Sequence, residues 1–215
     1  MRYQINPHFL YNTLESIKGM AVEDNNKKIF NAAKSLIQVF KYSVKGEDMV
    51  LLEEELDVIK SYLNIQQIRF SNRLEVSYSF TDESLKCQVF KMLLQPLVEN
   101  SFCHGLEPKE GKWELSLRGR INKKGTLEIV IEDNGIGIES SILQEIRESL
   151  AHADDKSSAG PGSTITNSRI GIGIRNINNL IRHYYGSPYG LKIESTEGIG
   201  TEITIEIPAG GAAYV

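Results

Sequence analysis

The sequence of 215 residues has few cysteines, no long apolar run and little net charge. The spacing of its two cysteines, Cys87 and Cys103, fits no zinc motif, and so few thiols indicate a reducing compartment. No apolar run approaches the ~20 residues that span a bilayer, and we find no stretch with the pattern of a signal peptide. The net charge of −4 and the lack of a basic stripe argue against nucleic acid as a partner.

The most informative stretch is residues 129–138, IVIEDNGIGI. Its apolar first half predicts a buried strand, which stops abruptly at Asp133. Gly135 and Gly137 follow at a spacing of two, and glycine lets the backbone approach a flat ligand closely because it has no Cβ atom. A plain strand-to-helix turn would explain the same residues, so the neighbouring motifs must decide between the two interpretations.

The first 44 residues predict a helical hairpin. Residues 4–21 and 29–44 each carry apolar side chains at helical spacing, and the polar residues between them predict a turn. Because the hairpin is too small to bury a core alone, we expect a homodimer in which two copies form a four-helix bundle. His8 and Asn12 are four residues apart and share a helix face. A hydrogen-bonded surface histidine is the alternative to a functional one.

Helices and strands alternate in the rest of the chain. We expect helices over 51–69, 88–104, 140–151 and 171–185, and strands over 74–80, 112–121, 126–132, 191–195 and 202–208. Pro96 should kink or break the second of these helices. The order predicts an α+β protein in which an α/β sandwich, with one mixed sheet and helices on one face, follows the hairpin. Residues 152–168 are small and polar, which predicts a mobile loop.

Polar residues on the predicted helix 88–104 are candidates for a metal site. Glu99 and Asn100 precede His104 and Gly105, and Asn100 shares a helix face with His104. An amide oxygen suits Mg²⁺, which prefers oxygen ligands. Polar side chains turned to solvent are the alternative, but the many apolar neighbours indicate that this helix is substantially buried.

Two further groups of residues point to a nucleotide. Gly171 and Gly173 open a predicted helix directly after the loop, and a glycine-rich helix start offers amide donors to phosphate. Thr201 follows Gly200 into the last strand, where its hydroxyl could assist Asp133. Each signal is weak alone.

Five segments resemble, in order, the catalytic core of sensor histidine kinases of the LytS/YehU type. They are QINPHFLYNTL, LLQPLVENSFCHG, EDNGIGI, GIGIRNINNLIRHYYG and GTEITIEIP, and together they extend over residues 4–208. These kinases join a histidine-bearing dimerisation segment to an ATPase domain of the gyrase, chaperone, histidine kinase and MutL superfamily. The resemblance implies a dimerisation and phosphotransfer region at residues 1–70. It implies an ATP-binding domain with a two-layer sandwich and a mostly antiparallel sheet at residues 71–215.

The resemblance also implies roles for the residues of the nucleotide site. Asp133 resembles the carboxylate that accepts a hydrogen bond from the adenine amino group, with Gly135 and Gly137 closing the backbone over the base. Asn100 resembles the Mg²⁺ ligand of the family, and His104 and Gly105 belong to the same nucleotide-binding motif.

Roles in phosphate binding and phosphotransfer follow from the same resemblance. Gly171 and Gly173 resemble the glycines beside the phosphates, with residues 152–168 as a lid over ATP, and Thr201 completes the site. His8 resembles the histidine that accepts the γ-phosphoryl group, with Asn12 in the same motif. Glu99 resembles the glutamate that activates water in related ATP hydrolases.

The sequence departs from the wider family pattern at two positions. Phe9 follows His8 where many histidine kinases have an acidic residue, which leaves the general base unassigned, although the LytS-type pattern also has an aromatic residue there. Cys103 stands where related asparagine motifs often have a lysine, which removes one expected phosphate contact.

We therefore expect an ATP- and Mg²⁺-dependent histidine kinase that phosphorylates His8 and passes the phosphoryl group to an aspartate in the receiver domain of a response regulator. An ATP hydrolase that works as a conformational clamp, and a nucleotide-binding signalling scaffold with weak catalysis, are the alternatives. We also expect this chain to be the cytoplasmic part of a longer protein of the inner or plasma membrane, whose membrane segments lie outside it.

Overall fold

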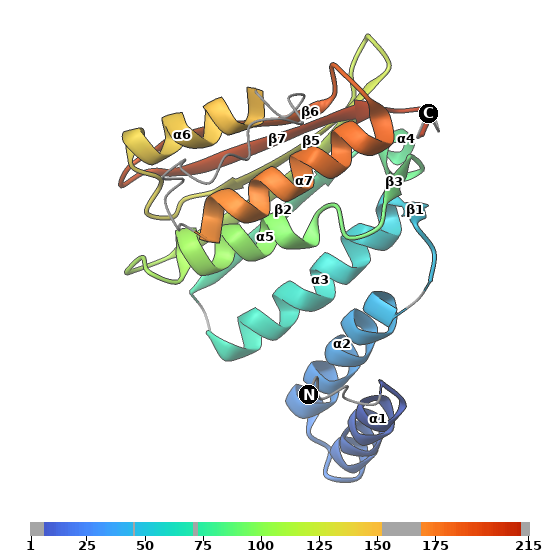
Figure 1. Ribbon diagram of the computed structural model, residues 1–215. Helices are drawn as coiled ribbons and strands as arrows, with labels where there is room; N and C mark the ends of the chain where they lie inside the picture. Colours follow the sequence, from blue (N-terminus) through green and yellow to red (C-terminus); the bar gives the residue numbers. More distant parts are fainter. Residues whose placement is uncertain (1–6, 45, 71–72, 152–168, 212–215) are drawn as a thin grey trace, which may run out of the picture.

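The computed structural model describes residues 7–44, 46–70, 73–151 and 169–211 of the protein. It shows a helical hairpin that projects from a layered domain of helices and strands (Figure 1). The predicted loop and ATP lid at residues 152–168 lie outside the described residues. Residues 4–6, the start of the first predicted helix, also lie outside them. Within the described ranges, no helix is long and apolar enough to cross a membrane.

The predicted hairpin is present as helices α1 (Pro7–Glu23) and α2 (Lys27–Val44). The Asn26 side chain begins α2 by accepting a hydrogen bond of 3.1 Å from the Ile29 amide, which satisfies one of the unpaired donors at a helix start. Ala21, Ala33 and Ile37 are buried. Helix α2 also packs against the helix that follows it, where the Asn64 side chain donates a hydrogen bond of 2.9 Å to the Ser35 hydroxyl.

Helix α3 (Leu52–Arg69), which follows strand β1 (Met49–Leu51), packs into the main domain. Leu52, Ile59 and Leu63 are fully buried, in the same hydrophobic core as the inward-facing residues of the sheet. The division of the chain at residues 70 and 71 remains a prediction.

The predicted mixed sheet is confirmed. It has five strands, β2 (Leu74–Phe80), β4 (Trp113–Ile121), β5 (Thr126–Asp133), β6 (Gly190–Thr196) and β7 (Gly200–Pro208). The strand order is β2-β4-β5-β7-β6, with β2 parallel to β4 and every other pair antiparallel. Buried residues alternate with more exposed ones along β4, β5 and β7, because successive side chains of a strand point to opposite faces.

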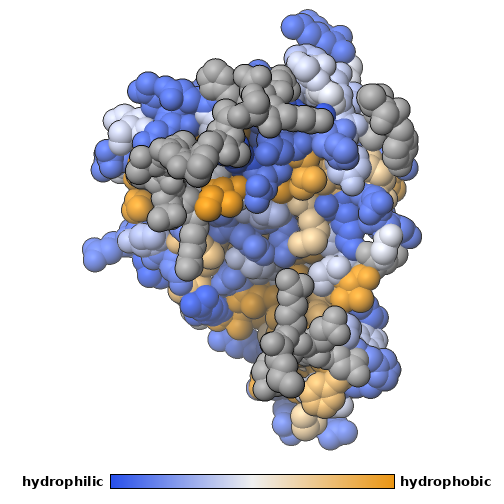
Figure 2. Space-filling view, viewed as in Figure 1, coloured by the Kyte–Doolittle hydropathy of each residue, from blue (hydrophilic) through white to orange (hydrophobic). Residues whose placement is uncertain are grey.

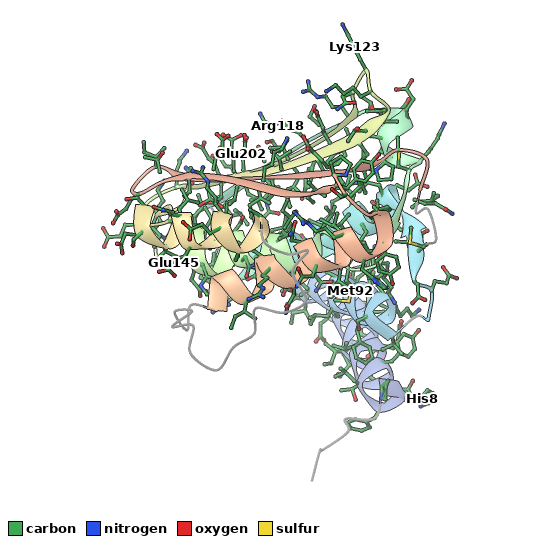
Figure 3. All side chains as sticks on the ribbon, turned by 45° about the horizontal axis from the view of Figure 1, so that its top comes forward. His8, Met92, Arg118, Lys123, Glu145 and Glu202 are labelled. Atoms are coloured by element: carbon green, nitrogen blue, oxygen red, sulfur yellow. The ribbon has the colours of Figure 1, made fainter. Side chains whose placement is uncertain are left out.

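Helices cover one face of this sheet. They include α5 (Gln95–Asn100), α6 (Ser140–Ala151) and α7 (Arg169–Tyr185), which lie side by side (Figure 1). The opposite face carries charged side chains, among them Arg118 and Glu202, whose side chains are 3.2 Å apart (Figure 3). The architecture is therefore the predicted two-layer sandwich with helices on one side.

The single predicted helix over residues 88–104 is wrong in its first part. Residues Gln88–Phe90 form strand β3, which pairs antiparallel with β1, and the one-turn helix α4 (Asp82–Leu85) precedes it. Helix α5 starts only at Gln95, with Pro96 in its first turn, where a missing amide hydrogen costs nothing. Residues Ser101–Leu106 continue as a π-helix, η1. Pairing with distant residues overrides the local apolar pattern here.

Candidate functional site

Asp133 and Asn100 line one small cleft between the sheet and the helices. Asp133 ends strand β5, and Asn100 ends helix α5. The full lining is Asn100, Ser101, His104, Gly105, Asp133, Gly137, Ile138, Ile174, Thr201 and Ile203. Its volume of about 20 Å³ holds roughly one water molecule. Since pockets for small molecules usually measure ~300–1,000 Å³, a nucleotide base enters this cleft only if its walls move apart.

Asp133 is a buried acceptor at the floor of the cleft. Its side chain is buried, and the Gly135 amide donates a hydrogen bond of 2.9 Å to Oδ1. Burial raises the pKa of Asp133, whereas hydrogen bonds from the Gly135 amide, the Ser101 hydroxyl and the Thr201 amide, together with the charge of Lys109, lower it. The arrangement provides a carboxylate that is strongly oriented and shielded from water, as recognition of a ligand amino group requires.

Glycines allow the strand end and η1 to touch. A Cβ atom on Gly135 would lie 2.4 Å from the carbonyl carbon of Gly105, and the Ile136 amide donates a hydrogen bond of 2.9 Å to the Gly105 carbonyl oxygen. Gly137 has φ of +69°, and a Cβ atom there would lie 2.1 Å from the Thr196 carbonyl oxygen. Only glycine fits such close backbone contacts. Gly135 and Gly137 are thus required by backbone contacts within the protein, and their close approach to a base stays a prediction.

Asn100 presents a buried hydrogen-bond donor that could bind a phosphate oxygen. Its Nδ2 atom is buried and has no hydrogen-bond partner among the described residues, and such a group is costly unless a ligand bonds it. A Cβ atom on Gly173 would lie 3.2 Å from this atom, so the start of α7 covers Asn100 closely. No cluster of three or more His, Cys, Asp or Glu side chains within the described ranges could hold a metal ion. A Mg²⁺ ion would therefore take most of its other ligands from phosphate and water.

The π-helix η1 shapes one wall of the cleft. Its wider turn is closed by a hydrogen bond of 2.8 Å from the Glu107 amide to the Phe102 carbonyl oxygen. The Phe102 ring is buried against Trp113, Phe70 and Tyr62, with ring centroids 5.6, 5.4 and 6.5 Å away. π-Helical turns are rare and occur mostly at functional sites. Here the turn is held by a rigid aromatic cluster.

The predicted residues Gly171 and Glu99 do not belong to the lining of the cleft. Gly171 is in the first turn of α7. The Glu99 carboxylate accepts a hydrogen bond of 2.8 Å from the side-chain amide (Nε2) of Gln95. Burial raises the pKa of Tyr62, a residue of α3, and the charges of Cys103 and Glu99 add to this effect. Glu99 and Cys103 therefore lie on the side of α5 and η1 that is close to α3.

Two serines that the sequence patterns did not single out also belong to the site. Ser101 bonds to Asp133, and Ser195 accepts a hydrogen bond of 2.9 Å from the Ile138 amide. The hydroxyl oxygen of Thr201 lies 3.0 Å from that of Ser195, so Thr201 reaches Asp133 through its backbone amide. Ser101 directly follows Asn100, which is the only signal in the sequence that could have revealed it.

His8 lies apart from the cleft. It is exposed on α1, and Asn12 Nδ2 lies 3.3 Å from His8 Nδ1, as their spacing predicts. Figure 3 shows His8 on the projecting hairpin, away from the sheet. The structure therefore brings together most of the predicted nucleotide residues, but not the predicted phosphoacceptor.

Comparison with known families agrees with this geometry. Residues 88–211 match the model described as histidine kinase-, DNA gyrase B-, and HSP90-like ATPase, and residues 1–74 match the model described as histidine kinase. The sensor histidine kinase YesM of Bacillus subtilis is 36% identical over 209 residues, which are 97% of this chain and 32% of that protein. The sensor protein LytS of Bacillus anthracis is 32% identical over 215 residues, 97% of this chain and 33% of that protein. The chain thus spans about a third of the length of these relatives.

Solved structures support the fold. The histidine kinase domain of the blue-light activated histidine kinase EL346 from Erythrobacter litoralis has a TM-score of 0.50 at 12% identity, over 94% of each chain. The catalytic domain of histidine kinase ThkA has a TM-score of 0.51 at 14% identity, over 75% of this chain and 94% of that one. The ATPase model matches more than half of the residues of this chain, and the histidine kinase model matches the residues before them. The chain therefore belongs to the family of histidine kinase-, DNA gyrase B- and HSP90-like ATPases.

Proposed function

We propose that this chain is the ATP-dependent core of a sensor histidine kinase in a two-component system. It phosphorylates itself on His8 and passes the phosphoryl group to an aspartate in the receiver domain of a response regulator. The observation that carries the proposal is that Asp133 and Asn100, which come from separate sequence motifs, line the same cleft. The matches to the two family models support the same conclusion.

Nucleotide recognition follows from the residues of the cleft. Asp133 accepts a hydrogen bond from the adenine amino group, whereas guanine presents an oxygen at the equivalent position. Gly105, Gly135 and Gly137 keep the backbone close to the base, and His104 and Thr201 complete the walls of the cleft. The site is thus selective for adenine nucleotides.

The phosphates lie toward Asn100 and the start of α7 in this proposal. Asn100 provides an amide oxygen for Mg²⁺, and the amides around Gly171 and Gly173 bind phosphate oxygens. Mg²⁺, when bound, neutralises charge on the phosphates during transfer. The buried Nδ2 atom of Asn100, which lacks a partner in the described part of the chain, supports this placement.

His8 is the nucleophile of the proposed reaction. A ring nitrogen attacks the γ-phosphorus, the bond to the oxygen that bridges the β- and γ-phosphates breaks, and ADP leaves. Asn12 lies beside Nδ1 and limits rotation of the ring. Because the hairpin holds His8 away from the cleft (Figure 3), transfer requires the hairpin of the same or of a partner subunit to approach the nucleotide.

We infer a homodimer from the exposed side of the hairpin. Phe9 and Met20 are 68% and 55% exposed on α1, eleven residues or about three turns apart. Ile29, Leu36 and Val44 are 47%, 41% and 54% exposed on α2 and repeat about every two turns. Figure 2 shows apolar residues on the surface of the hairpin. A second hairpin that covers this stripe completes a four-helix bundle.

The place of action follows from the proposed substrates. ATP and receiver domains are found inside the cell, so we infer that this chain works in the cytoplasm. The similarity to sensor kinases supports attachment to the inner or plasma membrane through segments outside this chain.

The test is incubation with ATP labelled on the γ-phosphate, in Mg²⁺, of the parent chain and of His8→Gln. We expect label on the parent that is stable to alkali and labile to acid, and none on His8→Gln. Release of free phosphate without labelled protein would instead indicate an ATP hydrolase. Nucleotide binding with neither product would indicate a signalling scaffold.

A further inference from the structure

Glu55 is a carboxylate buried in α3, outside the nucleotide cleft. It is 1% exposed, and it accepts hydrogen bonds from the Tyr42 hydroxyl, from the Met92 amide at 2.6 Å and from the Leu94 amide at 3.0 Å. Burial of a carboxylate is unfavourable even when it is hydrogen-bonded, and an apolar residue of similar size is often as stable in such a position. A contribution to the overall stability of the fold therefore does not by itself explain why a glutamate occupies this position.

The bonds of Glu55 hold an unusual backbone conformation. Met92 has φ of +62°, which is rare for a residue with a side chain. Glu55 binds the amide of Met92 itself and those of the two residues that follow, Leu93 and Leu94. Figure 3 shows Met92 where the hairpin meets the helices of the main domain. The carboxylate thus fixes the course of the chain at this junction.

Leu94 connects this junction to Asn100. It precedes the first turn of α5, and its carbonyl oxygen accepts hydrogen bonds of 3.1 and 3.0 Å from the Leu97 and Val98 amides. Helix α5 has six residues and ends at Asn100, so Asn100 lies roughly 9 Å from the start of the helix. A shift of Leu94 therefore moves Asn100 with it.

Tyr42 connects the same carboxylate to the hairpin. It is a buried residue near the end of α2, and the Lys91 ammonium group lies 5.0 Å from the centre of its ring. Alongside, Met49 of β1 pairs with Phe90 of β3. A movement of α2 therefore reaches the segment before α5 through Glu55.

We propose that Glu55 is a positioning residue that fixes the position of the Asn100 side chain through the start of α5. Its hydrogen bond from Tyr42 makes that position depend on the position of the hairpin. Glu55 does not touch the nucleotide, and the proposal rests on the proposed role of Asn100 in binding Mg²⁺ with the nucleotide.

The test is equilibrium binding of ADP to the full chain, with Mg²⁺ and with EDTA. The variants are Glu55→Gln and the matched control Glu53→Gln, an exposed carboxylate in the same helical turn. We expect Glu55→Gln to reduce the gain in affinity from Mg²⁺ by about tenfold, because small misplacements of a ligand have large effects. The affinity for ADP in EDTA depends on Asp133 rather than on Asn100. It should change by less than about twofold, which is the ~0.5 kcal/mol within which distant sites act independently.

Two further measurements separate positioning from a general structural role. In an Asn100→Ala background, Glu55→Gln should reduce the gain from Mg²⁺ no further, since both changes act on the same contact. Tyr42→Phe removes a single hydroxyl and should reduce the gain several-fold, with faster hydrogen exchange at the Met92 and Leu94 amides. If Glu55→Gln does not fold, Tyr42→Phe decides the matter alone.

The outcomes distinguish this proposal from the function on which it rests. Equal losses with and without Mg²⁺, or no loss at all in Glu55→Gln and Tyr42→Phe, would overturn the positioning role while leaving the proposed function intact. A parent chain that binds no ADP, or that gains nothing from Mg²⁺, would overturn the proposed function and the role of Glu55 with it.

Discussion

The carboxylate of Asp133 lies directly against the backbone of Gly105, so closely that a Cβ atom on Gly105 would be 2.7 Å from Oδ1. One residue ends a strand and the other belongs to the π-helix that follows Asn100. This contact makes the strand end and the helix a single unit. Any residue larger than glycine must push them apart.

Gly105→Ala should therefore weaken nucleotide binding. The added methyl group displaces Asp133 or η1, and overpacking of this kind lowers the free energy of unfolding by about 1–3 kcal/mol. We expect the affinity for ADP, measured by calorimetry, to fall at least about tenfold, which corresponds to ~1.4 kcal/mol. Gly19→Ala on α1 is the control, because its Cβ atom meets nothing within 4 Å. Equal ADP affinities in the two variants would contradict the close contact.

Gly137→Ala and Gly125→Ala separate backbone strain from close approach. Both glycines have positive φ, +69° and +73°, but a Cβ atom meets the Thr196 carbonyl oxygen only at Gly137. We expect Gly125→Ala to lower the free energy of unfolding by ~1–2 kcal/mol. Gly137→Ala should lose about 1–3 kcal/mol more through the clash. Urea denaturation measures the free energy of unfolding of both variants. Equal losses would show that the turn after Asp133 rearranges to accommodate the added methyl group.

The stability of the protein should depend on pH through Asp133. Burial raises the pKa of this carboxyl in the folded state above its ordinary value, despite the hydrogen bonds that it accepts. Below the unfolded pKa of ~3.9 both states are protonated, and folded stability falls as pH rises through the folded pKa. The neutral variant Asp133→Asn escapes this loss, so its stability relative to the parent should increase with pH and then level off. A relative stability that decreases with pH would mean that the folded pKa is lowered.

Strongly periodic elements could be predicted from the sequence. Strand β2 and helix α6 have the predicted bounds, because alternation or helical periodicity at these positions agrees with the tertiary packing. The Asp133 and Asn100 motifs were also recognisable, since each is a compact group of polar residues and glycines within an apolar segment. Their presence in one cleft depends on the tertiary structure, and it was the family resemblance, not the periodicity, that indicated it.

The segment before α5 could not be predicted, for a physical reason. Gln88–Phe90 forms a strand only because residues Met49–Leu51 pair with it. Its continuation is held by Glu55 from α3. Ser195 is likewise part of the site through a contact with Ile138, far away in the sequence. Local patterns contain no information about such partners.

Leu36→Glu should weaken the proposed dimer. Leu36 is 41% exposed on the apolar stripe of α2, and Leu180, equally exposed on α7, is the matched control. Burial of a leucine contributes ~1.5–3 kcal/mol, and a symmetric dimer loses this twice, so we expect dimerisation to weaken on the order of a hundredfold or more. Sedimentation equilibrium should show a dimer for the parent and Leu180→Glu. A Leu36→Glu variant that dimerises as well as the parent would place the interface elsewhere.

The central claim is that Asp133 and Asn100 form two walls of one adenine nucleotide site. Calorimetric titration of Asp133→Ala and Asn100→Ala with Mg²⁺ and an ATP analogue that cannot be cleaved tests it most directly, with Asp82→Ala as an exposed control. Since a hydrogen bond to a charged group contributes ~1.5–3 kcal/mol, we expect Asp133→Ala to lose about ten- to a hundredfold in affinity. Asn100→Ala should lose the contribution of Mg²⁺, GTP should not compete in the parent, and Asp82→Ala should bind normally. Unchanged affinity in both cleft variants would contradict the account.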